Sequence, residues 1–190
     1  MVGLEKFELS SGPIRFIFNF RQRTRNSKNS NSRTEQNFLA PNFKVLSMSA
    51  NKKTIVLNWK GNFRFEAKTE KGLSINFDAL AKYGGEETAP TPMETVLACL
   101  AGCTSFDVVN ILKKKRQKLS AYSVETEAER REEPPEVFTK IHIKYIIKGK
   151  NISKEAVEKA IQLSYDKYCS VGAMLKKTAE ITTSYEIIQE

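Results

Sequence analysis

The chain has 190 residues, of which 40% are hydrophobic and 28% charged, and its formal net charge is +9. This length and composition suffice for one globular domain with a real core, alone or with a tail. No run of 18 or more apolar residues occurs, so the sequence predicts no membrane-spanning helix. The three cysteines, Cys99, Cys103 and Cys169, are odd in number and sparse, which argues against a secreted disulfide scaffold and favours a reducing, cytoplasmic location.

The first 47 residues differ from the rest of the chain. They carry eight Lys/Arg against three Glu, a net charge of +5, whereas residues 48–190 carry 23 against 19. Residues 21–36 are polar, rich in Arg, Asn and Ser, and have no apolar period, which predicts disorder. We expect residues 1–47 to be a disordered or dispensable extension, read from an upstream start codon, and residues 48–190 to form the domain. An organelle transit peptide is the alternative, against which Glu5 and Glu8 count.

Short strands are predicted first along the domain. Runs of β-branched and aromatic residues predict strands at 54–59, 63–69 and 73–77, with turns between them. A loop rich in Gly and Pro follows, and then a helix begins. Thr91 is the predicted N-cap, Pro92 takes the first helical position, and Glu94 completes a capping box. Apolar residues at helical spacing continue this helix to residue 118.

The second half of the domain adds two strands, two helices and a last strand. The strands are predicted at 123–130 and 137–147. Ser153 begins a helix that runs to about residue 168, Ser170 caps a short helix at 171–177, and a final strand covers 181–188. The order of meander, helix, hairpin, helix pair and strand predicts an α+β fold, because it lacks the strand–helix alternation of a doubly wound sheet.

Several kinds of site are absent from the sequence. It has one His, His142, on an alternating strand, and it has no Cys-x-x-Cys pair, no phosphate-binding Gly-rich loop and no Gly-x-Ser-x-Gly elbow. We therefore expect no metal and no bound cofactor. We interpret His142 as a partly exposed strand residue and not as a general base. Glu125, Glu127 and Glu129 alternate along a strand and are interpreted as its solvent face.

Cys99 and Cys103 lie four residues apart on the first predicted helix and share a face of it. Their neighbours are small: Ala98, Ala101, Gly102 and Ser105. An interior Gly costs a helix about 1 kcal/mol relative to Ala, so Gly102 indicates tight packing or ligand access beside Cys103. The alternative interpretation is that both cysteines are small buried hydrophobic residues.

Cys169 lies at a predicted junction between two helices. The partial positive charge of a helix N-terminus and the cation of Lys167 would favour its thiolate and lower its pKa. If Cys103 and Cys169 meet in space, they form a dithiol that can reduce a peroxide, because the sulfenic acid left on one thiol condenses with the other.

Two segments carry a family resemblance. Residues 90–103, PTPMETVLACLAGC, resemble the Pro-x-Glu-x-Leu-x-x-Ala-x-Ala-x-Cys helix of the OsmC/Ohr superfamily of osmotically inducible and organic hydroperoxide resistance proteins. Residues 167–171, KYCSV, resemble the second cysteine motif of that superfamily. With the order of elements, the resemblance covers about residues 54–188. Residues 134–139 and 167–171 are most similar to the uncharacterised YhfA-like branch.

The resemblance implies an OsmC-like fold in which antiparallel sheets wrap around two long central helices of an intertwined homodimer. It implies that Cys103 is the peroxidatic and Cys169 the resolving cysteine, acting on organic hydroperoxides. An external dithiol such as dihydrolipoamide would restore the thiols, without metal or flavin. The Glu that follows the motif proline in the peroxidases is Met93 here. Glu94 and Arg64, the only Arg between residue 48 and the helix, are therefore candidate supporting residues.

Three functions follow from these observations. The first is a thiol peroxidase acting on organic hydroperoxides. The second is a redox or small-ligand-binding protein of the same fold that handles another apolar electrophile, an alternative raised by Met93. The third is nucleic-acid binding through the basic run at residues 113–118. We interpret that run as the solvated end of a helix, because cations complement the helix dipole there and the domain is nearly neutral, so we expect neither a nucleic-acid nor a membrane partner.

Overall fold

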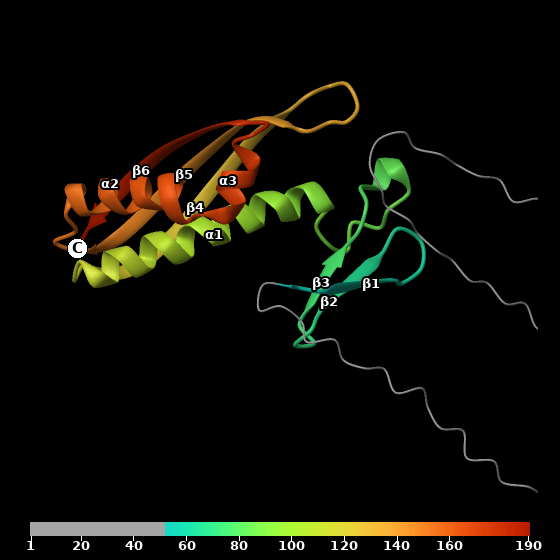
Figure 1. Ribbon diagram of the computed structural model, residues 1–190, viewed down its shortest axis with the longest axis horizontal. Helices are drawn as coiled ribbons and strands as arrows, with labels where there is room; N and C mark the ends of the chain where they lie inside the picture. Colours follow the sequence, from blue (N-terminus) through green and yellow to red (C-terminus); the bar gives the residue numbers. More distant parts are fainter. Residues whose placement is uncertain (1–51) are drawn as a thin grey trace, which may run out of the picture. The chain divides into compact units, whose positions relative to one another are not determined.

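The computed structural model describes residues 52–190 (Figure 1). The expectation for residues 1–47 lies outside these residues. The first described elements are β1 (Ile55–Trp59), β2 (Phe65–Thr69) and β3 (Ser74–Phe77), which pair antiparallel in the order β1-β2-β3 and which we call sheet A. The predicted meander is confirmed. Many apolar side chains of sheet A and its turn are exposed: Ile55, Val56, Leu57, Trp59, Leu73 and Ile75.

A loop ordered by Asp78 leads from sheet A to the first long helix. The Asp78 carboxylate accepts hydrogen bonds from the Ala79 N–H at 2.8 Å and from the N–H and hydroxyl of Thr88 at 3.0 and 2.8 Å. These bonds, first among them the one from the Thr88 backbone, lower the pKa of Asp78 to about 2. The loop also contains a short 3-10 helix, η1 (Ala81–Tyr83), which the sequence did not predict.

Helix α1 (Pro92–Lys114) begins with the predicted capping box. The Thr91 hydroxyl accepts from the Glu94 N–H at 3.3 Å, and the Glu94 carboxylate accepts from the Thr91 N–H at 2.7 Å. The helix ends before the predicted residue 118, because Arg116 adopts a left-handed conformation with φ 58° and the next strand begins at Lys118.

Among the described residues, α1 is also the one helix long and apolar enough to cross a membrane, judged by length and composition alone. A core helix of a soluble protein passes the same test. The side chains of α1 that are buried against the rest of the domain are Leu100, Thr104, Val108 and Leu112. The absence of an unbroken apolar run therefore did not exclude such a helix, because a few interspersed small and polar residues leave its mean hydropathy high.

The second sheet, sheet B, contains β4 (Lys118–Arg130), β5 (Phe138–Lys150) and β6 (Glu180–Gln189) in the order β4-β5-β6. Strands β4 and β5 form the predicted antiparallel hairpin, but β6 pairs parallel to β5. The expectation of purely antiparallel sheets was therefore wrong. Between β5 and β6 the chain forms two helices that return it to the starting end of β5, and parallel pairing requires such a crossover.

The crossover consists of α2 (Lys154–Leu163), the π-helical turn η2 (Ser164–Tyr168) and α3 (Ser170–Leu175). Ser153 caps α2 as predicted, since its hydroxyl accepts from the Ala156 N–H at 3.1 Å. The two long central helices of the dimer stay a prediction; within this chain α1 has 23 residues and α2 has 10. Helix α2 ends where the backbone widens into the π-helical turn η2, and Cys169, which follows η2, has an extended backbone with ψ 98°.

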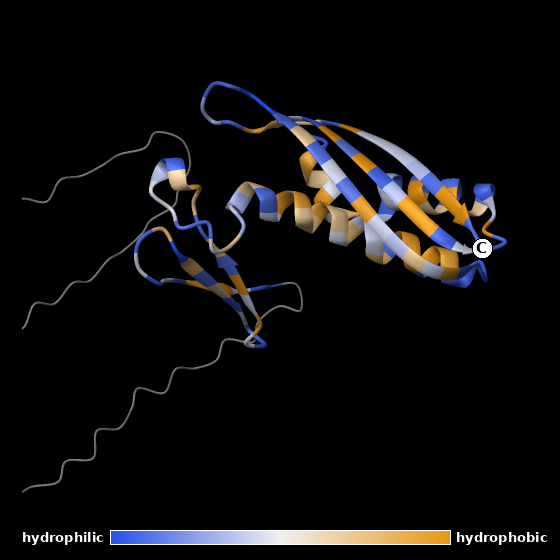
Figure 2. Ribbon diagram, turned by 180° about the vertical axis from the view of Figure 1, so that it is seen from behind, coloured by the Kyte–Doolittle hydropathy of each residue, from blue (hydrophilic) through white to orange (hydrophobic). Residues whose placement is uncertain are grey.

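The core lies between sheet B and the helices. Both α1 and α2 cover the same face of the sheet (Figure 1). The bands along β5 in Figure 2 show that hydrophobic and hydrophilic residues alternate, and every second residue over most of the strand is buried. The buried core residues come from α1, sheet B and α2, and include Leu112, Tyr145, Ile147, Val157 and Ala160. The opposite face of sheet B carries the charged residues, including ion pairs from Lys140 to Glu129 at 3.0 Å and from Lys144 to Glu125 at 3.8 Å. The predicted solvent face of β4 is thus confirmed.

Candidate dithiol site

The structure brings together two of the three cysteines. Cys103 lies in the middle of α1 and is half-buried, whereas Cys169 lies between η2 and α3 and is only 5% exposed. The Cys103 thiol contributes to the raised pKa of Cys169, as expected of two sulfurs that lie near each other. Cys99, one turn before Cys103, is exposed, so it is not the small buried hydrophobic residue of the alternative interpretation. The dithiol of the described chain is therefore Cys103 with Cys169.

Cys169 holds its proton strongly. Burial is the first cause that raises its pKa, to about 11, and the neighbouring Cys103 thiol raises it further. The Gly172 N–H, which donates to Cys169 Sγ at 3.3 Å, acts in the opposite direction. The prediction that a helix N-terminus lowers this pKa was wrong, because α3 is a helix of six residues and desolvation outweighs its dipole. A thiol that stays protonated at neutral pH suits a resolving role better than the first attack.

This protonation state predicts the pH dependence of labelling at Cys169. In pulsed alkylation with peptide mass spectrometry, modification of Cys169 should reach its midpoint near pH 11, while the exposed Cys99 is modified faster at every pH. Because the pKa is higher in the folded protein than the ordinary 9.0, this thiol's contribution to the free energy of unfolding is complete below about pH 9 and is lost as the pH rises through about 11. A midpoint below pH 9 would contradict this assignment.

Behind the dithiol lies a buried row of hydroxyl groups. Tyr145 from β5 bonds to Thr104 of α1 at 2.7 Å, and Thr104 bonds to Ser164 of η2 at 2.9 Å. Ser164 in turn donates to Asp107 Oδ2 at 3.0 Å. Sequence reasoning missed this row. Only the position of Asp107, four residues after Cys103 and three after Thr104, hinted that it lies near both on α1.

Two glycines shape the space around the thiols differently. A Cβ on Gly172 would lie 3.3 Å from Cys169 Sγ and 3.6 Å from Leu100, so α3 approaches the buried thiol closely because this residue has no side chain. A Cβ on Gly102 would meet nothing within 4 Å. The tight packing predicted at Gly102 is therefore not made by the described residues of this chain, and the surface beside Cys103 is open.

The candidate supporting residues have partners of their own. The Glu94 carboxylate bonds to both the N–H and the hydroxyl of Thr91, so its contacts are those of the helix cap. Arg64, which immediately precedes β2, pairs with Glu86 at 3.4 Å. Sequence reasoning missed Glu86, which has no motif to mark it. Met93 is half-buried against the core.

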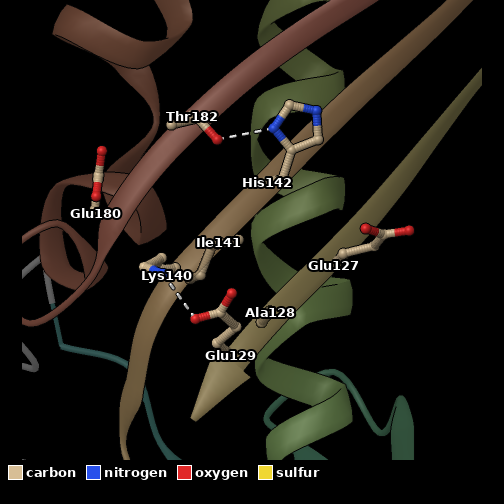
Figure 3. Close-up of a pocket in the computed structure, with 8 residues that line it drawn as sticks. All are labelled: Glu127, Ala128, Glu129, Lys140, Ile141, His142, Glu180 and Thr182. Atoms are coloured by element: carbon tan, nitrogen blue, oxygen red, sulfur yellow. Dashed lines mark hydrogen bonds and ion pairs between the residues drawn. The ribbon is translucent and has the colours of Figure 1, made fainter. Parts of the chain in front are cut away.

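His142 lies on the outer face of sheet B, away from α1. Figure 3 shows its ring beside Thr182 of β6, to which it is hydrogen-bonded at 2.8 Å; a second bond of 2.8 Å joins it to Ser184. The shallow pocket around it is lined by charged strand residues, among them Glu127, Glu129 and Lys140. The interpretation of His142 as a half-exposed strand residue is confirmed. Within residues 52–190 no group of three His, Cys, Asp or Glu side chains could hold a metal ion.

The fold and the site together define an α+β protein with a dithiol between a long helix and a π-helical turn. The protein-family model described as OsmC-like protein matches residues 84–184. Protein YhfA of Escherichia coli strain K12 is 39% identical over 132 residues, which span 70% of this chain and 96% of that protein. The chain belongs to the OsmC-like family, as the two cysteine motifs predicted, and its similarity to YhfA confirms the predicted branch.

Solved structures agree with this assignment. A hypothetical protein from Aquifex aeolicus VF5 is 34% identical with a TM-score of 0.65, over 73% of this chain and 98% of that one. A Legionella pneumophila protein described as an organic hydroperoxide resistance protein OsmC has a TM-score of 0.57 at 15% identity, over 73% of this chain and 99% of that one. The second likeness is one of fold alone.

Proposed function

We propose that this protein is a thiol peroxidase that reduces organic hydroperoxides through Cys103 and Cys169. The observation that carries the proposal is the placement of a buried, protonated thiol near a half-buried thiol on α1, which contributes to its raised pKa. A thiol with a raised pKa is a poor first nucleophile but a ready source of a second sulfur. The Legionella relative is named for resistance to the substrate class that we propose.

The chemistry balances with these two residues and an external reductant. The Cys103 thiolate attacks one peroxide oxygen, the O–O bond breaks, and the other oxygen leaves as the alcohol after taking a proton. Cys103 is then a sulfenic acid, with which Cys169 condenses to form a disulfide and water. A dithiol such as dihydrolipoamide supplies the two electrons that reopen the disulfide, so the cycle needs no bound cofactor.

We also propose that the working unit is an intertwined homodimer. Phe106 on α1 is 83% exposed and lies beside an apolar hollow lined by Gly102, Ser105 and Val109. Sheet A also exposes apolar side chains, including Trp59 at 68%. Large contiguous apolar surfaces mark interaction sites, and a second copy of α1 would cover this one. Arg64, held by Glu86, is the supporting residue that we propose for the shared site.

Replacing Phe106 by Glu should therefore split the dimer. Light scattering after gel filtration should give about twice the chain mass of 21.6 kDa for the wild type and one chain mass for the variant, because a buried unpaired charge at a helix contact is strongly unfavourable. Ile188→Glu, a matched change at an exposed position of β6, should leave the mass unchanged. A wild-type protein that elutes as a monomer would rule out the dimer.

A second candidate function is a redox or binding protein of the same fold that does not turn over peroxides. Met93 favours it, because the Glu that follows the motif proline in the family's peroxidases is absent and Glu94 is bonded to the helix cap. Arg64 pairs with Glu86 of the loop and not with a carboxylate at position 93, so Cys103 would be less activated than in those peroxidases.

One experiment separates the two candidates. Fully reduced protein is mixed with an organic hydroperoxide and dihydrolipoamide, and the loss of peroxide is followed over time. Turnover faster than with dihydrolipoamide alone supports the peroxidase. A folded, fully reduced protein that gives no such acceleration would exclude it and leave the second candidate.

A further inference from the structure

The hydroxyl row ties the residue after Cys103 to the turn that precedes Cys169. Thr104 of α1 follows Cys103 directly in the chain, and its hydroxyl bonds to the Ser164 hydroxyl at 2.9 Å. The Ser164 carbonyl accepts from the Cys169 N–H at the end of η2, also at 2.9 Å. One hydrogen bond between side chains and one along the backbone therefore connect the two cysteines.

The hydrogen bonds of this row have a fixed direction. An Asp carboxylate only accepts, so Ser164 uses its single proton on Asp107. Ser164 then accepts from Thr104, and Thr104 in turn accepts from Tyr145. Thr104 is 3% exposed and Ser164 is fully buried, so solvent does not replace the bond between them. A buried hydroxyl that loses its partner is costly, and this bond is therefore kept in the folded protein.

Ser164 is the buried anchor of η2. Of the five side chains of this turn it is the one that is buried, and the other four, at residues 165–168, are exposed. Both side chains that bond to the Ser164 hydroxyl, Thr104 and Asp107, belong to α1. The position of η2 on α1 is therefore set at this hydroxyl.

The sulfur of Cys169 is held against the same side of α1. It accepts from the Gly172 N–H at 3.3 Å. A Cβ on Gly172 would lie 3.6 Å from Leu100 Cδ1, so the start of α3 lies directly against Leu100. Leu100, Cys103 and Thr104 occupy helical positions i, i+3 and i+4 and share a side of α1. The turn before Cys169 and the helix after it thus both contact α1 beside Cys103.

We propose that Thr104 and Ser164 are positioning residues, whose hydrogen bond holds Cys169 where it can form a disulfide with Cys103. This rests on the proposed function. A disulfide requires the two Cβ atoms to lie about 3.5–4.5 Å apart, so small shifts of η2 along α1 decide whether it closes. By fixing η2, the bond raises the effective concentration of one thiol at the other.

The disulfide equilibrium with glutathione measures this effect without a hydroperoxide. In a Cys99→Ser background, oxidised glutathione takes two hydrogens from the two remaining thiols, which gives one protein disulfide and two molecules of reduced glutathione. The fraction of disulfide is measured by mass spectrometry after acid quenching, over a series of ratios of oxidised to reduced glutathione. The equilibrium constant is the effective concentration of the dithiol.

Thr104→Val, which removes the hydroxyl and keeps the size, should lower this constant about 100-fold, the cost of a misplacement of about 1 Å. For this two-electron couple the fall corresponds to a rise of about 59 mV in reduction potential. Thr104→Ser keeps the hydroxyl and should retain the background value. Ser164→Ala should act like Thr104→Val, and the double variant should fall no further than either, because both remove the same bond.

Two controls separate positioning from a general loss of stability. Thr95→Val makes the same change elsewhere on α1, where the hydroxyl bonds to the Thr91 carbonyl one turn earlier at 3.0 Å, and should leave the constant unchanged. Val157→Ala removes volume from the buried face of α2. It should lower the melting temperature at an unchanged constant.

Several results would overturn the positioning role. They are a Thr104→Val constant equal to that of Thr95→Val, an equally large fall in Val157→Ala, and a Thr104→Ser constant as low as that of Thr104→Val. If circular dichroism shows Thr104→Val to be unfolded, Ser164→Ala carries the same comparison. A background protein that forms the disulfide without these shifts contradicts the positioning role alone. One that forms no such disulfide contradicts the proposed function and the positioning role with it.

Discussion

Replacing Cys103 by Ser is expected to lower hydroperoxide consumption to the rate of the reductant alone, a fall of at least about 1000-fold. The thiolate is the nucleophile in this chemistry, and a Ser hydroxyl is not ionised at neutral pH. Cys103 is half-buried and the substitution is nearly isosteric, so the fold should remain. A peroxide assay with dihydrolipoamide as reductant measures the effect.

The matched control is Cys99→Ser. Cys99 lies one helical turn from Cys103 and is exposed, so it has the same chemistry without the buried partner. Its replacement should leave the rate unchanged. A Cys103→Ser protein that still consumes peroxide rapidly, or a Cys99→Ser protein that does not, would place the nucleophile elsewhere.

Replacing Cys169 by Ser is expected to separate the first step from the rest of the cycle. The variant should consume one equivalent of hydroperoxide per chain and then turn over about 100-fold more slowly with dihydrolipoamide, because no second sulfur is in place to condense with the sulfenic acid. A Ser oxygen can still accept from the Gly172 N–H, so the start of α3 should be kept.

The trapped intermediate gives this prediction a direct readout. Dimedone, which reacts with sulfenic acids, should add to Cys103 in the Cys169→Ser protein, and mass spectrometry of the peptide should locate it there. The wild type under the same conditions should form a disulfide and take up little dimedone. Full turnover by Cys169→Ser would show that an external thiol resolves Cys103 and that Cys169 is only structural.

Local signals predicted most of the elements. The capping box at Thr91 and Glu94 fixed the start of α1, and Ser153 fixed the start of α2, because both depend on residues three positions apart. The alternation around His142 identified β5 and its two faces. The parallel pairing of β6 was not predictable from such signals, since it depends on the path of the chain through α2, η2 and α3.

The site was also predicted only in part, because the sequence reveals local motifs but not tertiary contacts. The motifs identified Cys103 and Cys169, but the protonation of Cys169 was predicted with the wrong sign. A helix N-terminus is a local feature that sequence reveals, whereas burial is a tertiary one, and burial dominates here. In the hydroxyl row, Tyr145 and Thr104 are 41 positions apart in the chain, and Thr104 and Ser164 are 60 apart. Ser164 and Asp107 are 57 apart. No rule of local sequence spacing could therefore have found the whole row.

The most direct measurement is a map of the disulfide that forms when fully reduced protein meets one equivalent of an organic hydroperoxide. The intact chain should lose two hydrogens, and peptide mass spectrometry without reduction should find the peptide of Cys103 joined to that of Cys169 within one chain. A bond from Cys103 to Cys99, a bond between chains, or three thiols left free after the peroxide has been consumed would contradict a Cys103–Cys169 cycle.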